Sequence, residues 1–179
     1  YGANTVVSQH PVTGATYVTA VADTPSDDPQ ARIHVIGGGG TTAGILHLLD
    51  AAGYELTTGV LHEGDTDTAV ARQLGIEPIT VDPYTPIDAA AARRARSAVQ
   101  AADVCVIGDI EVGSGNLPNL QILEAAPAVI STAERPFTER NFAGAAGAEV
   151  WTALADHMIH SRPPALIGTV ERVLADESL

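Results

Sequence analysis

The sequence contains no lysine, since all nine of its basic residues are arginine. A single cysteine, Cys105, excludes an internal disulfide framework, and Cys105 lies in an apolar run typical of a buried strand. Aromatic residues make up only 4% of the 179 residues, and the longest apolar runs are far shorter than the roughly 18 residues that indicate a membrane span. Without lysine, this sequence cannot itself hold a conventional phosphate-loop ATPase site.

Acidic residues dominate the charge. The 22 aspartates and glutamates against nine arginines give a formal net charge of −13. Such a chain offers no basic stripe to a nucleic acid, so we expect no nucleic-acid partner. An acidic composition rich in small residues and free of lysine is typical of halophilic archaea, whose proteins stay solvated at high salt. A GC-rich genome that favours Ala, Gly, Arg and Asp is the alternative explanation.

From Arg32 onward, short apolar runs alternate with segments of helical pattern. The expected strands cover residues 33–36, 56–61, 77–81, 103–107 and 128–131, and the expected helices cover 43–52, 68–74, 88–101, 119–125 and 166–175. Strands and helices that alternate at this spacing form a parallel sheet with right-handed crossovers. The sequence therefore predicts an α/β fold: a Rossmann-like parallel sheet of about five strands with helices on both faces.

The chain divides into three regions of different composition. Residues 1–22 alternate in strand fashion around the turn residues 10–14, which predicts a small β-hairpin. Residues 23–31 are rich in proline and aspartate, as is typical of a linker, and 32–179 form the α/β domain. Because the chain begins with Tyr1 and not with methionine, we expect it to be part of a longer protein.

A run of glycines follows the first strand of this domain and precedes its first helix. Glycines in this position leave backbone N–H groups free for an anion, and the register Gly38-x-Gly40-x-x-Ala43 fits the relaxed dinucleotide fingerprint. The alternative is that the glycines only make a tight strand-to-helix turn. The predicted ligand-binding residues of this loop are Gly37, Gly38, Gly39, Gly40, Thr41 and Thr42.

Further polar residues follow the other strands, at the sheet edge where ligands bind in such folds. The candidates are Glu63, Asp65, Asp109, Glu111, Ser114, Asn116, Arg135, Arg140 and Asn141. Each has a structural alternative. Asp65 is placed to cap a helix, the loop from Asp109 to Asn116 contains two turn glycines, and the arginines stand close in sequence to Glu134 and Glu139. We expect no metal site, since His157 and His160, three residues apart on a predicted helix, form only a weak pair.

Several segments together resemble a known family. The motifs are Val35-Ile-Gly-Gly-Gly-Gly-Thr41, Glu63-Gly-Asp-Thr-Asp67, Glu111-Val-Gly-Ser-Gly-Asn-Leu117 and Glu134-Arg-Pro-Phe-Thr-Glu-Arg-Asn-Phe-Ala-Gly144. They are similar to the extra C-terminal domain of haloarchaeal ATP-binding proteins that serve importers of cobalamin, haem or iron-siderophores. Tyr1-Gly2 and the hairpin resemble the end of the ATPase domain that precedes it.

The resemblance implies a cytoplasmic ABC-transporter subunit, peripheral to the membrane, that contacts the upstream ATPase domain and the permease subunits and forms a homodimer. ATP and Mg would be bound by the parent ATPase, and the extra domain would bind a nucleotide or corrinoid, or another small anionic ligand, without catalysis of its own. Two alternatives stay open. One is a dinucleotide-binding enzyme with Glu63 or Asp109 as its acid–base residue, and the other is a purely structural dimerisation module.

Overall fold

The computed structural model describes residues 5–9, 16–20, 31–60, 64–80, 89–110 and 117–175. Its first elements are two short antiparallel strands, β1 (Thr5–Gln9) and β2 (Thr16–Ala20), which pair along their whole length. The strands of the predicted hairpin are therefore confirmed. The predicted turn at 10–14 lies outside the described residues, as does all but the last residue of the predicted linker.

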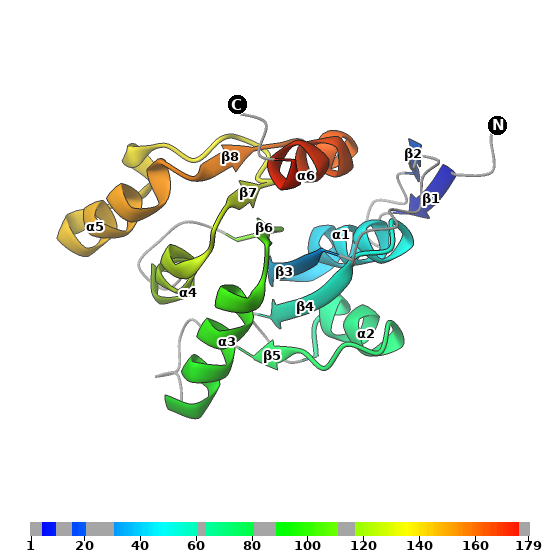
Figure 1. The fold of residues 1–179 in the computed structure, drawn as a ribbon, viewed down its shortest axis with the longest axis horizontal. Helices are drawn as coiled ribbons and strands as arrows, with labels where there is room; N and C mark the ends of the chain where they lie inside the picture. The colour runs from blue at the N-terminus through cyan, green and yellow to red at the C-terminus, as the bar shows by residue number, and fades with distance from the viewer. Residues whose placement is uncertain are drawn as a thin grey trace.

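Six parallel strands form the main sheet, in the order β5-β4-β3-β6-β7-β8 (Figure 1). Their bounds are β3 (Arg32–Gly37), β4 (Glu55–Val60), β5 (Ile79–Thr80), β6 (Val104–Ile107), β7 (Val129–Ser131) and β8 (Met158–His160). The chain starts in the middle of the sheet, builds outward to β5, and then returns beside β3 to build the other half. This is the strand order of a doubly wound Rossmann sheet, with its topological switch point between β3 and β6.

Helices cover both faces of this sheet (Figure 1). One face carries α1 (Gly39–Ala51), α2 (Thr66–Gln73) and α6 (Leu166–Leu174), and the other carries α3 (Ala89–Ala101), α4 (Leu117–Ile122) and α5 (Gly144–Ala155). Short 3-10 turns complete the described elements: η1 (Leu123–Ala125), η2 (Glu139–Asn141) and η3 (Pro163–Ala165).

The central strands are apolar on both sides because both of their faces are covered. Val104 and Val106 of β6 pack in the cluster of α1, α2 and α6, whereas Cys105 and Ile107 pack in the cluster of α3, α4 and α5. This alternation follows from the two-residue period of a strand. The predicted Rossmann-like α/β fold is confirmed.

The ends of α1 and α2 follow the predictions closely, whereas the start of α1 does not. α1 begins at Gly39, so that two of the four glycines form its first turn and the helix starts earlier than the sequence pattern predicts. Gly53 and Gly75 follow α1 and α2 with φ of +88° and +77°, the left-handed conformation that glycine adopts at a helix C-terminus. A single glycine thus marks the end of each of these helices.

The region after residue 142 differs from the predictions. The predicted helix over His157 and His160 is wrong, because Met158–His160 form the edge strand β8, which pairs with β7. The helix α5 is not among the predicted elements, since its alanines and glycines give little apolar periodicity. Three residues are too few to show a periodic pattern. Met158–His160 form a strand because they pair with the edge of β7.

Candidate functional site

The candidate site lies at the carboxyl edge of the sheet, where the loops after β3 and β6 meet. In a doubly wound sheet this switch point is where ligands enter, because the two loops diverge to opposite faces. Here the two loops touch directly. The N–H of Gly38 donates to the carbonyl of Asp109 at 3.1 Å, and the N–H of Gly108 donates to the carbonyl of Ile36 at 2.8 Å.

Two glycines allow this close approach. A Cβ added to Gly37 would lie 2.8 Å from the backbone nitrogen of Asp109, and one added to Gly108 would lie 3.2 Å from the Cα of Thr42. Both positions would also press against the Thr42 hydroxyl. These two glycines are therefore required by packing, which supports the tight-turn interpretation for Gly37.

The Thr42 side chain ties the two loops together. It is fully buried, its hydroxyl donates to the carbonyl of Gly38 at 3.1 Å, and the N–H of Asp109 donates to it at 3.2 Å. Thr132, after β7, makes a similar connection, since its hydroxyl lies 2.8 Å from the carbonyl of Ile107. The Thr42 hydroxyl thus has a structural role at the centre of the predicted site.

The open part of the loop is the N-terminus of α1. Gly38 is its N-cap residue and makes no side-chain capping bond, and the first turn contains no acidic residue. Gly39 has φ +76°, and no atom of the described residues lies within 4 Å of a Cβ built on it. The first N–H groups of a helix have no partner within the helix and carry a partial positive charge. The first turn of α1 can therefore donate hydrogen bonds to a ligand.

A carboxylate that was not predicted lies against this helix end. Asp67, in the first turn of α2, is fully buried, and neither carboxylate oxygen has a hydrogen-bond partner of good geometry within the described residues. Burial raises the pKa of Asp67 and the charge of Asp65 adds to the rise, while the N–H groups of Thr68, Asp67 and Gly39 oppose it. The sequence offered Asp65, which is the N-cap residue of α2 without a capping bond, as the candidate instead.

The remaining predicted residues, apart from the two arginines, fall into three groups. Glu63, Glu111, Ser114 and Asn116 lie outside the described residues. Asp109 is exposed at the switch point. Asn141 is exposed in η2, where its side-chain oxygen accepts from the N–H of Thr138 at 2.7 Å, so its amide is used in the loop.

The two predicted arginines are exposed. Neither Arg135 nor Arg140 forms an ion pair with any residue that the structure describes, so the alternative of pairing with Glu134 and Glu139 is not seen. Their loop is anchored to the core, because Phe142 is buried and its ring lies 5.3 Å from that of Trp151 and 6.3 Å from that of Phe137. An anchored loop thus presents two exposed guanidinium groups after β7.

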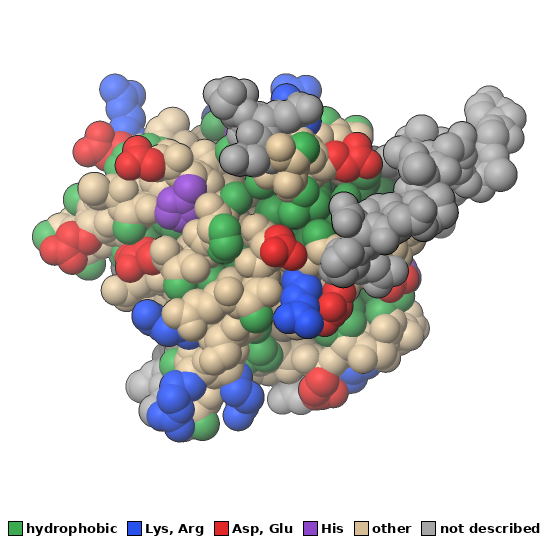
Figure 2. Space-filling model, viewed as in Figure 1, with side chains coloured by type: hydrophobic (Ala, Val, Ile, Leu, Met, Phe, Trp, Pro, Cys, Tyr) green, Lys and Arg blue, Asp and Glu red, His purple; other side chains and the backbone are tan. Residues whose placement is uncertain are grey.

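Arginine also gathers on α3. Arg93, Arg94 and Arg96 are exposed, as expected for a solvated face, and blue side chains collect at the lower end of the molecule in Figure 2, where α3 lies in Figure 1. Acidic side chains are scattered over the rest of that view. No ligand is predicted for this patch.

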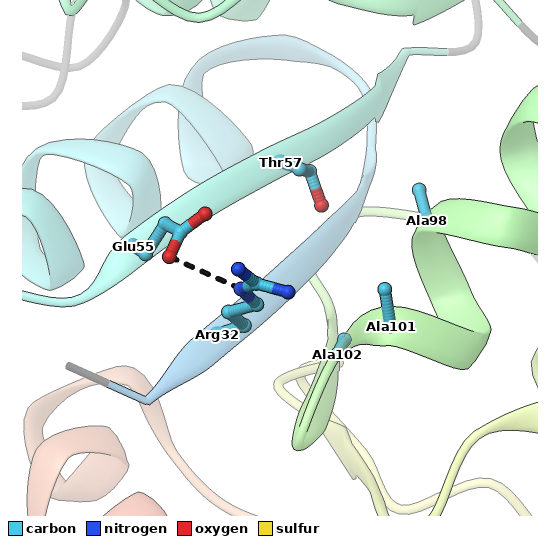
Figure 3. A pocket seen from close by; sticks show the side chains of 6 residues that line it. All are labelled: Arg32, Glu55, Thr57, Ala98, Ala101 and Ala102. Carbon is cyan, nitrogen blue, oxygen red and sulfur yellow. Dashed lines mark hydrogen bonds and ion pairs between the residues drawn. The ribbon is translucent and has the colours of Figure 1, made fainter. Parts of the chain in front are cut away.

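A small hollow lies at the opposite, amino edge of the sheet (Figure 3). It has a volume of about 100 Å³ and is lined by Arg32, Glu55, Thr57, Ala98, Ala101 and Ala102. The Nε of Arg32 and the Oε2 of Glu55 form an ion pair at 3.1 Å across its mouth. Pockets for nucleotides or cofactors have roughly 300–1,000 Å³, so this hollow is too small for them.

The buried His34 in β3 is structural. Its Nδ1 lies 2.8 Å from the hydroxyl of Thr57, and burial lowers the pKa of His34 to about 4, so that the ring is neutral at pH 7. Within the described ranges, no three histidine, cysteine or acidic side chains come together to hold a metal ion. In the same part of the chain, no helix is long and apolar enough to cross a membrane.

Comparison with known proteins identifies the family. A sequence model of the MJ0874 family matches residues 56–167, which is more than half of the chain. The chain therefore belongs to the MJ0874 family. The matched segment begins inside β4 and includes the loops after β6 and β7, whereas β3 and the glycine loop precede it.

Particular relatives come from one species. Cobalamin import ATP-binding proteins BtuD from two strains of Halobacterium salinarum are each 33% identical to this chain over 137 residues. The matches cover 72% of this chain and 34% of each relative, so the chain spans about a third of the length of the curated relatives it matches. The chain is thus similar, over 137 residues, to ATP-binding proteins of cobalamin import.

Solved structures with a similar backbone are enzymes. An imine reductase from Myxococcus stipitatus in complex with NAD+ has a TM-score of 0.46 and 14% identity, over 74% of this chain and 40% of that one. A dipicolinate synthase polypeptide from Bacillus halodurans has a TM-score of 0.44 and 18% identity, over 85% of this chain and 47% of that one. At such low TM-scores and identities, these similarities say nothing about the function of this chain.

Proposed function

We propose that this chain is an accessory domain, regulatory or assembly, of the ATP-binding subunit of an ABC importer for cobalamin, another corrinoid or a related iron chelate. The observation that carries the proposal is the 33% identity to cobalamin import ATP-binding proteins over 137 residues. In this arrangement residues 1–22 close the upstream ATPase domain, 23–31 link the two, and 32–179 form the accessory domain. Its partners are that ATPase domain, the permease subunits and a second copy, at the cytoplasmic face of the membrane.

The proposal includes a ligand site at the glycine loop. The open N-terminus of α1 at Gly39 and the exposed Arg135 and Arg140 support a small ligand along the carboxyl edge, such as a nucleotide or a corrinoid. Such a ligand regulates the importer only if it binds one state of the ATPase more tightly than the other. A domain that only assembles the subunits needs no ligand.

Thermal unfolding at high salt tests the ligand site. We expect adenosine, an adenine nucleotide or cobalamin to raise the melting temperature of the chain, because a ligand that binds only the folded state stabilises it. Gly39→Ala should remove the shift, since its methyl group enters the open loop. Gly75→Ala is the matched control, because Gly75 has the same left-handed φ, +77° against +76°, and equally open surroundings away from the site. If none of these compounds shifts the melting temperature, the chain has no such ligand site.

The importer role is tested in the whole transporter. Deleting residues 32–179 from the ATP-binding subunit should change cobalamin uptake by vesicles that contain the complete importer, while the ATP-binding motifs outside this chain stay intact. Uptake and ATP hydrolysis that are both unchanged by the deletion would contradict a regulatory or an assembly role. A loss of uptake that Gly39→Ala does not reproduce would instead favour assembly without a ligand.

A further inference from the structure

The buried carboxyl of Asp67 changes what the glycine loop can bind. Its side chain is fully buried in the first turn of α2, a helix that packs on α1, and both oxygens lack a hydrogen-bond partner of good geometry in the described part of the chain. The Gly39 N–H, at the first residue of α1, is near enough to act on it. Few buried polar groups stay unsatisfied in a native protein, and each such group calls for an explanation.

A carboxylate in this position competes with a phosphate. The N-terminus of a helix attracts one anionic group through its free N–H groups and its dipole. Asp67 already brings a negative charge there from within the chain. A phosphate on Gly39 and Gly40 would stand beside that charge, and like charges at such short range repel each other strongly.

A hydroxyl group has no such conflict. It accepts a hydrogen bond from a free N–H of the first helical turn and donates its own hydrogen to an oxygen of Asp67. One uncharged ligand atom then pairs both with an N–H that has no partner within the helix and with the carboxylate. Sugars, polyols and the ribose of a nucleoside carry such hydroxyl groups.

We propose that Asp67 is a specificity-determining residue that excludes phosphate from the N-terminus of α1 and accepts a hydrogen bond from an uncharged, hydroxylated group of the ligand. The inference rests on the proposed ligand site and deepens it, because it names the chemistry of the group that meets the glycine loop. A nucleotide would then bind through its ribose at Gly39 and Gly40, with its phosphates directed elsewhere.

Calorimetric titration of the 179-residue chain with pyrophosphate and with adenosine tests the inference. At pH 8 and constant salt, the wild-type chain should bind adenosine and not pyrophosphate. Asp67→Asn keeps the shape and removes the charge, so it should bind pyrophosphate at least tenfold more tightly than the wild type and adenosine at least tenfold more weakly. Asp50→Asn, which removes an exposed charge in the last turn of α1, at the opposite end of the helix from Gly39, should behave as the wild type does.

Nuclear magnetic resonance of the wild-type chain tests the same inference without relying on the Asp67→Asn variant being folded. Pyrophosphate should leave the amide signals of Gly39, Gly40 and Thr41 in place, whereas adenosine should shift them. Three results would each overturn the exclusion: pyrophosphate binds the wild type as tightly as it binds Asp67→Asn, Asp50→Asn gains as much affinity for pyrophosphate as Asp67→Asn does, or Asp67→Asn does not bind pyrophosphate. Adenosine that binds both chains equally, or does not bind the wild type, would overturn the role of Asp67 as acceptor.

These outcomes separate the two proposals. Pyrophosphate bound by the wild-type chain refutes the inference about Asp67 and leaves the ligand site at the glycine loop standing. The ligand site itself fails only if adenosine, adenine nucleotides and cobalamin all leave the chain unaffected.

Discussion

Replacing Gly108 with alanine tests the close packing between the two loops at the switch point. An added Cβ would lie 3.1 Å from the Cβ and 3.2 Å from the Cα of Thr42, and closer still to its hydroxyl. These atoms cannot move cheaply, because they belong to α1 and to a side chain fixed by two hydrogen bonds. Inserting a methyl group into a well-packed core costs about 1–3 kcal/mol, so we expect a loss of roughly 2 kcal/mol in the free energy of unfolding.

The matched control is Gly168→Ala in α6. Gly168 is exposed, and within the described part of the chain nothing lies within 4 Å of a Cβ built on it, so the added methyl group has room there. Alanine is favoured over glycine in a helix by about 0.8–1 kcal/mol, and this variant should therefore be more stable than the wild type. The same chemical change should shift the midpoint of urea unfolding in opposite directions at the two positions, as followed by circular dichroism at constant salt.

A third variant identifies Thr42 as the cause. Thr42→Ala alone should lose about 1–3 kcal/mol, because it leaves the N–H of Asp109 without its acceptor. In that background the Gly108→Ala change should cost less than in the wild type, since the space of the Thr42 side chain is free. Wild-type stability of Gly108→Ala, or the same loss in both backgrounds, would refute the packing argument.

Four further predictions concern the core and the exposed loop. Because burial lowers the pKa of His34 from 6.5 to about 4, below pH 6.5 the unfolded chain binds a proton that the folded chain does not; stability should fall by about 2 kcal/mol from pH 7 to pH 5, and by less in His34→Gln. Burial raises the pKa of Cys105 to about 12, so iodoacetamide at pH 8 should label it only after denaturation. Phe142→Ala should cost about 3–5 kcal/mol and shift the fluorescence of Trp151, the single tryptophan. Arg140→Ala should change the free energy of unfolding by less than about 0.5 kcal/mol, since its side chain is exposed and has no ion pair with a described residue.

The sequence predicts the sheet because its strands are short, apolar and separated by helices with clear ends. The run Val104–Ile107 is buried on both faces and is apolar throughout, which is the signal of a central parallel strand. The hairpin strands and the position of the glycine loop were also predictable, because turn residues separate segments of regular apolar pattern. The strand β8 was not, because three residues become a strand only beside β7.

The candidate site was predictable in its place and less so in its chemistry. Four consecutive glycines mark the loop. Which of them is packed against other residues depends on contacts with the segments around Thr42 and Gly108, which lie far apart in the sequence. The sequence does not single out Asp67, because an acidic residue in the first turn of a helix is common. Only its burial, which the sequence does not show, makes it unusual. Contacts between distant segments therefore decide the chemistry that the loop motif leaves open.

The central position of β3 has a consequence for folding order. β4 and β6 each pair with β3 and not with each other, and β3 precedes the segment that the family match covers. A chain limited to residues 56–167 would hold two half-sheets with unpaired facing edges, which invite association between chains. In the whole chain, β6 can dock only after the residues between β3 and β6 have been looped out, and such long-range pairing slows folding. Any shortened chain that is meant to fold must therefore keep Arg32 and the residues that follow it.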